Sequence, residues 1–194
     1  TIEAQTAAGK TETIEADYLL VATGRGPVTT GLGAEDVGLT MERGYIKVDP
    51  LFRTGVPGIS AIGDVITFET PGHPQLAHLS SAEGILCAER VAGHDVRPIN
   101  YDHVPAGTYC DPEIGSVGLT EREAKARGHD VAIGTFAFRV LGRARMANET
   151  DGFVKILADA QTDRVLGVHI IGPDAGTLIA EAVLAMEYGA SSAD

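Results

Sequence analysis

A glycine–aspartate pair at the end of a short apolar stretch is the strongest chemical signal in this sequence. The stretch reads Ala61-Ile62-Gly63-Asp64. In an open α/β sheet, ligands bind beyond the carboxyl ends of the strands, where a glycine lets a ligand approach the backbone and a carboxylate can bind a sugar or sugar-alcohol hydroxyl. A Gly-Asp pair after a strand is more often a simple turn, so the ligand-binding interpretation depends on the elements around it.

The histidines and cysteines do not form the pattern of a metal or redox site. No two of the six histidines have metal-ligand spacing on a regular element, so we expect no bound metal. Cys87 and Cys110 lack a CxxC motif, and we expect two reduced thiols that are buried or half-buried. His169 lies on a predicted strand and is expected to be a packed or interface residue.

Charge and composition exclude several classes of function. The chain has 27 acidic and 15 basic side chains and a net charge of −12, so it should repel the backbone of nucleic acid. No apolar run approaches the roughly 18 residues of a membrane span, and the first residues lack the pattern of a signal peptide, which predicts a cytoplasmic protein with no membrane partner. In this acidic chain, Arg139, Arg143 and Arg145 are expected to form a loop that pairs with carboxylates across a dimer.

The first half of the chain has the pattern of an α/β layer. The run 17–24 is apolar almost throughout and ends in glycine, which predicts a strand buried on both faces of a parallel sheet. Helical spacing of apolar residues predicts a helix from Leu76 to Val91, with Gly93 as its stop. The other predicted elements are a polar hairpin at 1–16, loops at 25–44 and 66–74, strands at 45–49 and 58–63, and a turn at 50–57.

The second half has the pattern of an α+β domain. A composition shift at 97–102 predicts a domain boundary, and Thr120 and Glu123 have the spacing of a capping box for a helix at 120–127. A final helix is predicted from 173 to 188. The predicted strands are 108–110, 114–119, 131–139, 152–158 and 165–171.

Three segments, in this order, resemble the second half of flavoproteins with two dinucleotide-binding domains. Thr23-Gly24-Arg25 ends one predicted strand, Ala61–Asp64 ends another, and Gln75-Leu76-Ala77-His78 opens the following helix. The segments 112–121 and 163–176 resemble the dimerisation domain of disulfide reductases. The segment 181–190 is most similar to the dihydrolipoamide dehydrogenase branch, so the chain is identified by resemblance as a member of the class I pyridine nucleotide-disulfide oxidoreductase family.

This resemblance implies an arrangement of domains. A partial FAD/NAD(P)-binding sheet layer would be followed by an α+β dimerisation domain of antiparallel strands with packed helices. Residues 1–26 would end the NAD-binding domain, 27–101 would form the C-terminal part of the FAD-binding domain, and 102–194 would form a dimerisation domain truncated at its C-terminus.

The resemblance also implies which residues bind the cofactors FAD and NAD. Gly24 would lie beside the pyridine nucleotide, and Asp64 would bind the ribityl chain of the flavin. Gln75, Leu76, Ala77 and His78 would meet the flavin ring, mainly through backbone amides at the positive end of the helix dipole. The connection between Asp64 and Gln75 is several residues longer than is usual in the family.

The activity implied is oxidation of dihydrolipoamide, with FAD as the internal electron carrier and NAD⁺ as the acceptor. The enzyme would be a homodimer and a partner of 2-oxoacid dehydrogenase complex components. The family's redox cysteines and glycine loops are expected upstream of Thr1 and its catalytic His-Glu pair beyond Asp194. We therefore expect no catalytic residue within the chain, no activity of the chain alone, and weak or no flavin binding.

Two other interpretations stay open at this point. A sister enzyme of the same architecture, such as a glutathione-type or mercuric reductase or a soluble transhydrogenase, would share these motifs. A non-catalytic dimerisation module would use the same antiparallel domain without any cofactor.

Overall fold

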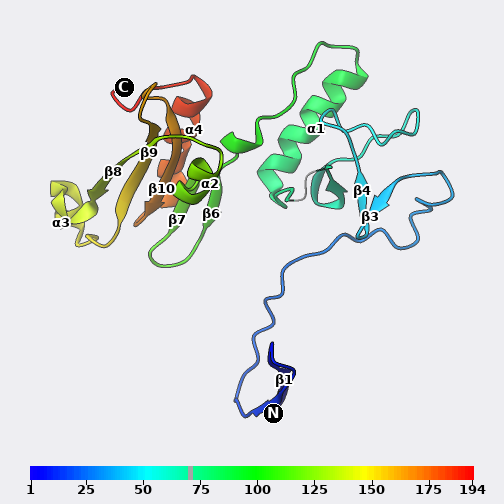
Figure 1. Cartoon of the computed structure of the whole chain (residues 1–194), viewed down its shortest axis with the longest axis horizontal. Coiled ribbons are helices and arrows are strands. Elements are labelled where there is room, and N and C mark those ends of the chain that lie inside the picture. The colour runs from blue at the N-terminus through cyan, green and yellow to red at the C-terminus, as the bar shows by residue number, and fades with distance from the viewer. Residues whose placement is uncertain (70–71) are drawn as a thin grey trace. The chain divides into compact units, whose positions relative to one another are not determined.

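The computed structural model describes residues 1–69 and 72–194, which form two compact units, Thr1–Val96 and Arg97–Asp194 (Figure 1). The first unit contains a small mixed sheet and one long helix, and the second contains an antiparallel sheet with helices. This combination confirms the expected fold class, an α/β layer followed by an α+β domain.

The first unit is built around a three-stranded sheet and the helix α1. The strands are β3 (Met41–Glu42), β4 (Tyr45–Lys47) and β5 (Ile66–Thr67), with β3 antiparallel and β5 parallel to β4. Helix α1 (Ala77–Val91) confirms the helix that the apolar spacing predicts. The buried apolar side chains of this unit are Ala34, Ile46, Val48, Phe52, Ile66, Leu79 and Leu86.

The N-terminal segment forms the expected polar hairpin. Strand β1 (Ile2–Gln5) pairs antiparallel with β2 (Thr11–Ile14), and the Thr6 carbonyl accepts the Gly9 N–H at 2.8 Å in the turn. Every residue of β2 is exposed. Backbone pairing, rather than a core of its own, therefore defines this hairpin.

The buried strand expected at 17–24 is wrong for this structure. The segment has no regular secondary structure, and Tyr18 and Leu20 are 93% and 87% exposed. A strand of a parallel sheet needs neighbours for its N–H and C=O groups and cover for both faces. Among the residues that the structure describes, none pairs with the backbone of 17–24 and none covers its faces. An apolar run alone therefore does not make a strand here.

The strand expected at 58–63 is also corrected. Only an isolated bridge between Ser60 and Arg53 remains of it, and the short 3-10 helix η1 (Gly63–Val65) follows. The regular strand, β5, lies instead at the beginning of the expected loop 66–74. Of that expected loop, residues 70 and 71 lie outside the described residues.

The second unit is a five-stranded antiparallel sheet in the order β6-β7-β10-β9-β8 (Figure 1). β10 lies in the centre and pairs with β7 and β9. All five expected strands are present, within a few residues of their expected bounds. The strands are β6 (Ala106–Thr108), β7 (Ile114–Gly118), β8 (Val131–Ala137), β9 (Phe153–Asp159) and β10 (Val165–Ile171).

Helix α4 (Ala175–Glu187) packs against β7 and β10 and forms the core of this unit with them. Val117, Val168 and Ile179 are buried in this core. The helix approaches β7 so closely that a Cβ at Gly115 would overlap the carbonyl of Ala175. The close packing of the helix on the sheet therefore requires a glycine at this position.

The second unit also contains short helices. Helix α2 (Glu121–Ala126) has the expected capping box: the Thr120 hydroxyl accepts the Glu123 N–H, and the Glu123 carboxylate accepts the Thr120 N–H at 2.9 Å. Hydrogen bonds from Thr120 hold the pKa of Glu123 below its ordinary value, against a small opposing effect of burial. The 3-10 helix η2 covers Tyr101–His103.

The arginine segment is not the expected loop. Arg139 lies in the 3-10 helix η3 (Phe138–Val140), and Arg143 and Arg145 lie on helix α3 (Gly142–Ala147). The Arg145 Nε donates to the Arg139 carbonyl at 2.7 Å, and Asn148 ends the helix in the left-handed conformation. Pairing of these arginines with carboxylates across a dimer stays a prediction.

Candidate cofactor-binding site

Asp64 lies in the turn η1, at the point where the sequence predicts a ligand. Its carbonyl accepts a hydrogen bond from Gln75 Nε2 at 3.1 Å. Its side chain is exposed, and the carboxylate makes no hydrogen bond or ion pair with any residue in the described part of the chain. The carboxylate is therefore available as an acceptor for ligand hydroxyls.

The beginning of α1 lies beside this turn. Leu76 is the N-cap and supplies no side-chain hydrogen bond, and the first turn contains no acidic residue. The first amides of a helix have no partner within the helix, and the dipole of a fifteen-residue helix favours electron-rich ligand atoms at this end. The structure thus brings Asp64 and Gln75–His78 together, and contacts between η1 and α1 hold the two segments side by side.

Glu83 holds the turn through a hydrogen bond to its backbone. The role of this residue was not predicted from the sequence. This residue lies on the second turn of α1 and is fully buried, at 0% exposure. Its Oε2 accepts the Gly63 N–H at 2.7 Å, immediately before Asp64. The signal was a glutamate between Leu79 and Leu86 on the apolar stripe of the helix, where an acid is found only when it is paired.

His73 is the second partner of Glu83. Its Nε2 lies 2.7 Å from Glu83 Oε1, and its side chain is only 4% exposed. The ring packs 5.7 Å from that of Phe68, which in turn lies 6.4 Å from that of Phe52. A residue of the connection between Asp64 and Gln75 is therefore held inside the unit by both a polar and an aromatic contact.

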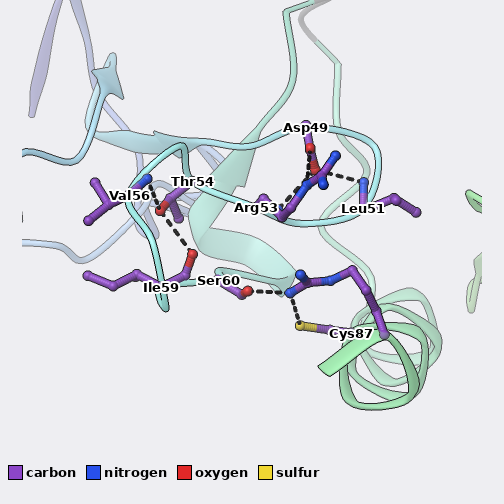
Figure 2. A network of polar contacts seen from close by, with 9 residues as sticks. Asp49, Leu51, Arg53, Thr54, Val56, Ile59, Ser60 and Cys87 are labelled. Atoms are coloured by element: carbon purple, nitrogen blue, oxygen red, sulfur yellow. Dashed lines mark hydrogen bonds and ion pairs between the residues drawn. The ribbon is translucent and has the colours of Figure 1, made fainter. Parts of the chain in front are cut away.

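A polar network in the loop 49–60 precedes the turn (Figure 2). Asp49 accepts hydrogen bonds from Leu51 N–H at 2.9 Å, from Arg53 N–H at 3.0 Å and from Arg53 Nε at 2.6 Å. Burial pushes the pKa of Asp49 upwards, but the hydrogen bonds from Arg53 and Leu51 outweigh it and lower the pKa. The Thr54 hydroxyl donates to the Ile59 carbonyl at 3.0 Å, so the loop closes on itself before it reaches Asp64.

Gly24 is not brought to this site by any contact among the described residues. It has a positive φ of 88°, and a Cβ built there would meet nothing within 4 Å. The conformation suits glycine, and the surrounding space is open. The assignment of Gly24 to NAD binding stays a prediction.

The remaining histidines and thiols make structural contacts or lie exposed. His169 Nε2 lies 3.0 Å from the Leu119 carbonyl, in a half-buried position. Cys87 and Cys110 are both free; Cys87 is half-buried as expected, but Cys110 is exposed, because it follows β6 in an open turn. Within residues 1–69 and 72–194, no group of histidine, cysteine and acidic side chains has the arrangement of a metal site.

No helix in the described part of the chain is both long enough and apolar enough to cross a membrane.

Comparison with known proteins identifies the family. Residues 1–84 match the pyridine nucleotide-disulphide oxidoreductase model, and residues 104–194 match the dimerisation domain model of the same family. The chain belongs to the pyridine nucleotide-disulphide oxidoreductase family.

Curated relatives and solved structures extend this match. The chain is 51% identical over 187 residues to the mitochondrial dihydrolipoyl dehydrogenase of Caenorhabditis elegans, covering 96% of this chain and 37% of that protein. It is 48% identical to the dihydrolipoyl dehydrogenase of Trypanosoma brucei brucei, covering 100% of this chain and 40% of that protein. The structure of LpdA from Mycobacterium tuberculosis matches with a TM-score of 0.83 and 31% identity over 96% of this chain and 39% of that one.

A disulfide reductase of a different name also matches. The HOCl-induced flavoprotein disulfide reductase RclA from Escherichia coli has a TM-score of 0.81 and 29% identity over 93% of this chain and 42% of that one. The chain therefore spans about two fifths of the length of the relatives that it matches.

Proposed function

We propose that this chain is part of an FAD-dependent dihydrolipoyl dehydrogenase that oxidises dihydrolipoamide with NAD⁺ as the electron acceptor. The observation that carries the proposal is its 45–51% identity, over nearly the whole chain, to dihydrolipoyl dehydrogenases of animals, a trypanosome and bacteria. This identity exceeds the 29% to the disulfide reductase RclA. It favours the dihydrolipoyl branch over a sister reductase or a transhydrogenase.

The geometry fits the ribityl and ring portions of FAD. Asp64 presents an exposed carboxylate for the hydroxyls of the ribityl chain, and Gln75 holds the Asp64 backbone in place. The first amides of α1, at Ala77 and His78, would meet the electron-rich edge of the flavin ring. Bound FAD would supply the electron transfer between dithiol and NAD⁺, and these residues would bind and orient it.

The proposed domains follow from the same assignment. Residues 1–26 would end the NAD-binding domain with Gly24 beside the nucleotide, residues 27–101 would belong to the FAD-binding domain, and residues 102–194 to the dimerisation domain. Homodimer formation is supported by the match of residues 104–194 to a dimerisation domain. Components of 2-oxoacid dehydrogenase complexes are the proposed further partners, and the two free thiols fit a reducing compartment such as the cytoplasm.

The test uses the longest native polypeptide that contains these residues. It should purify with FAD and reduce NAD⁺ in the presence of dihydrolipoamide, with little reduction of oxidised glutathione by NADPH. Asp64→Ala should lose most of the bound flavin, because the ribityl hydroxyls lose their carboxylate acceptor, while Asp36→Ala, an exposed acid of the same unit, should keep it. Flavin absorbance per subunit measures this loss.

Two outcomes would contradict the proposal. Full flavin occupancy in the Asp64→Ala protein would refute the role of Asp64. A protein that binds FAD but prefers another disulfide substrate would belong to the sister reductases.

A further inference from the structure

The described residues place a buried carboxylate directly behind the turn that carries Asp64. Glu83 is 0% exposed, and its two oxygens have different partners: Oε2 accepts the Gly63 N–H at 2.7 Å, and Oε1 lies 2.7 Å from His73 Nε2. Burying a carboxylate is costly unless hydrogen bonds compensate for the lost water. A charged hydrogen bond to a backbone amide is also among the stronger and more directional ones.

The bond to the Gly63 N–H controls the orientation of the Ile62–Gly63 peptide, one residue before Asp64. Gly63 has a φ of 76°, and a Cβ there would lie 3.2 Å from the Ser80 hydroxyl oxygen. A Cβ at Gly84 would likewise lie 3.2 Å from Ile62 Cδ1. Two glycines thus let the turn and the helix approach closely, and this close approach brings Gly63 within reach of Glu83.

Asp64 is consequently held by its backbone on both sides. The preceding amide, that of Gly63, donates to Glu83, and the carbonyl of Asp64 accepts from Gln75 Nε2 at 3.1 Å. The carboxylate itself makes no hydrogen bond with the described residues and is exposed. A rigid backbone beneath a ligand-binding side chain reduces the ordering cost of binding.

His73 links Glu83 to the segment between Asp64 and Gln75. Its buried ring reaches Glu83 from that connection and packs at a tilt against Phe68. His73 therefore docks against the core through Glu83, and the Glu83 carboxylate contacts both the turn and the connection.

We propose that Glu83 is a positioning residue that fixes the Gly63–Asp64 turn for the ribityl chain of FAD, and that His73 holds Glu83 in place. The proposal rests on the proposed function for the identity of the ligand. Glu83 does not touch the ligand in this scheme. It acts through the Gly63 amide and through the orientation of Asp64.

The first measurement is amide hydrogen exchange, which does not require FAD. In the longest native polypeptide, the peptide that contains Gly63 should exchange about 10- to 100-fold faster in Glu83→Leu than in the wild type, the loss expected for one buried charge-assisted hydrogen bond. Glu83→Gln keeps an acceptor for the Gly63 N–H and should remain within a few-fold of the wild type. Glu89→Leu, an exposed glutamate on the same helix, is the matched control and should leave this exchange unchanged.

The second measurement is the dissociation constant of FAD for the apoprotein, from the quenching of flavin fluorescence. We expect Glu83→Leu to weaken FAD binding about 10- to 100-fold and Glu83→Gln to restore most of it. His73→Ala, which removes the contact with Glu83 together with the packing against Phe68, should weaken binding several-fold. This variant keeps the proposal testable if Glu83→Leu does not fold.

The two measurements separate the two proposals. If the wild-type protein binds no FAD but Glu83→Leu accelerates exchange at Gly63, the proposed function fails and the structural role of Glu83 stands. Equal exchange at Gly63 in Glu83→Leu, His73→Ala and Glu89→Leu would overturn the positioning role. So would equal FAD affinity in these variants of a protein that does bind FAD.

Discussion

Replacing Gly115 by alanine should destabilise the second unit, because helix α4 leaves no room for a side chain on this part of β7. The new Cβ would overlap the carbonyl of Ala175 and lie 3.2 Å from the Cβ of Ile179. The carbonyl belongs to the backbone and cannot rotate away, so the helix itself must shift. Overpacking of this kind costs about 1–3 kcal/mol.

The same substitution at Gly134 is a matched control. Gly134 lies on β8 of the same sheet, and a Cβ there would meet nothing within 4 Å. Neither glycine has a positive φ. Gly134→Ala should therefore stabilise the unit by about 0.4–1 kcal/mol, because alanine reduces the conformational freedom of the unfolded chain.

A urea titration followed by the amide NMR signals of β9 and β10 would measure the stability of this unit by itself. The midpoint should fall in Gly115→Ala and rise slightly in Gly134→Ala, with equal slopes. Equal midpoints in the two variants would refute the packing of α4 on β7, because the overlap with the Ala175 carbonyl is present at Gly115 and absent at Gly134.

Two further predictions concern local polar contacts. Thr120→Ala removes the hydroxyl of the capping box and should lower the free energy of unfolding by about 1 kcal/mol in the same urea titration. Thr120→Ser should lower it less, because serine keeps the hydroxyl. Equal losses of stability in the two variants would argue against the cap. The hydrogen bond from His129, with further bonds from Thr162 and Gln161, lowers the pKa of Asp159 to about 2. Because the folded pKa is the lower one, this stabilisation is complete above the unfolded pKa of about 4 and is lost as the pH falls towards 2. Asp159→Asn should therefore reduce the loss of stability between pH 5 and pH 2. Urea midpoints across that range measure this loss. An unchanged pH dependence would contradict the lowered pKa of Asp159.

The second unit could be predicted from the sequence because its strands find their partners within the chain. Strands β9 and β10 are joined by a short turn and pair with each other, and the capping box at Thr120 is a local pattern. Helix α3 was missed because its residues, Gly142–Ala147, show no apolar periodicity; packing of Ala144 and the left-handed Asn148 define it instead.

The first unit was harder to predict from the sequence, because an apolar run forms a strand only where neighbouring strands are present to pair with it. The run 17–24 indicates burial, but burial requires neighbouring strands that the described residues do not supply. At the candidate site, the Gly-Asp turn and the start of α1 could be predicted because their chemistry is local. Glu83 and His73 could not, since their contacts join residues separated by ten and twenty positions and depend on how the long connection folds back.

The central place of β10 also determines when the second unit can fold during synthesis. Val168 of β10 pairs with Val117 of β7, and the helix that covers both strands follows β10 in the chain. As the chain leaves the ribosome, β6 can pair with β7 and β8 can pair with β9, but β7 must wait for β10 before it has a neighbour on its inner side. Nascent chains that stop before α4 would therefore expose the apolar face of β7, and chaperones that recognise such faces would have access to it during that interval.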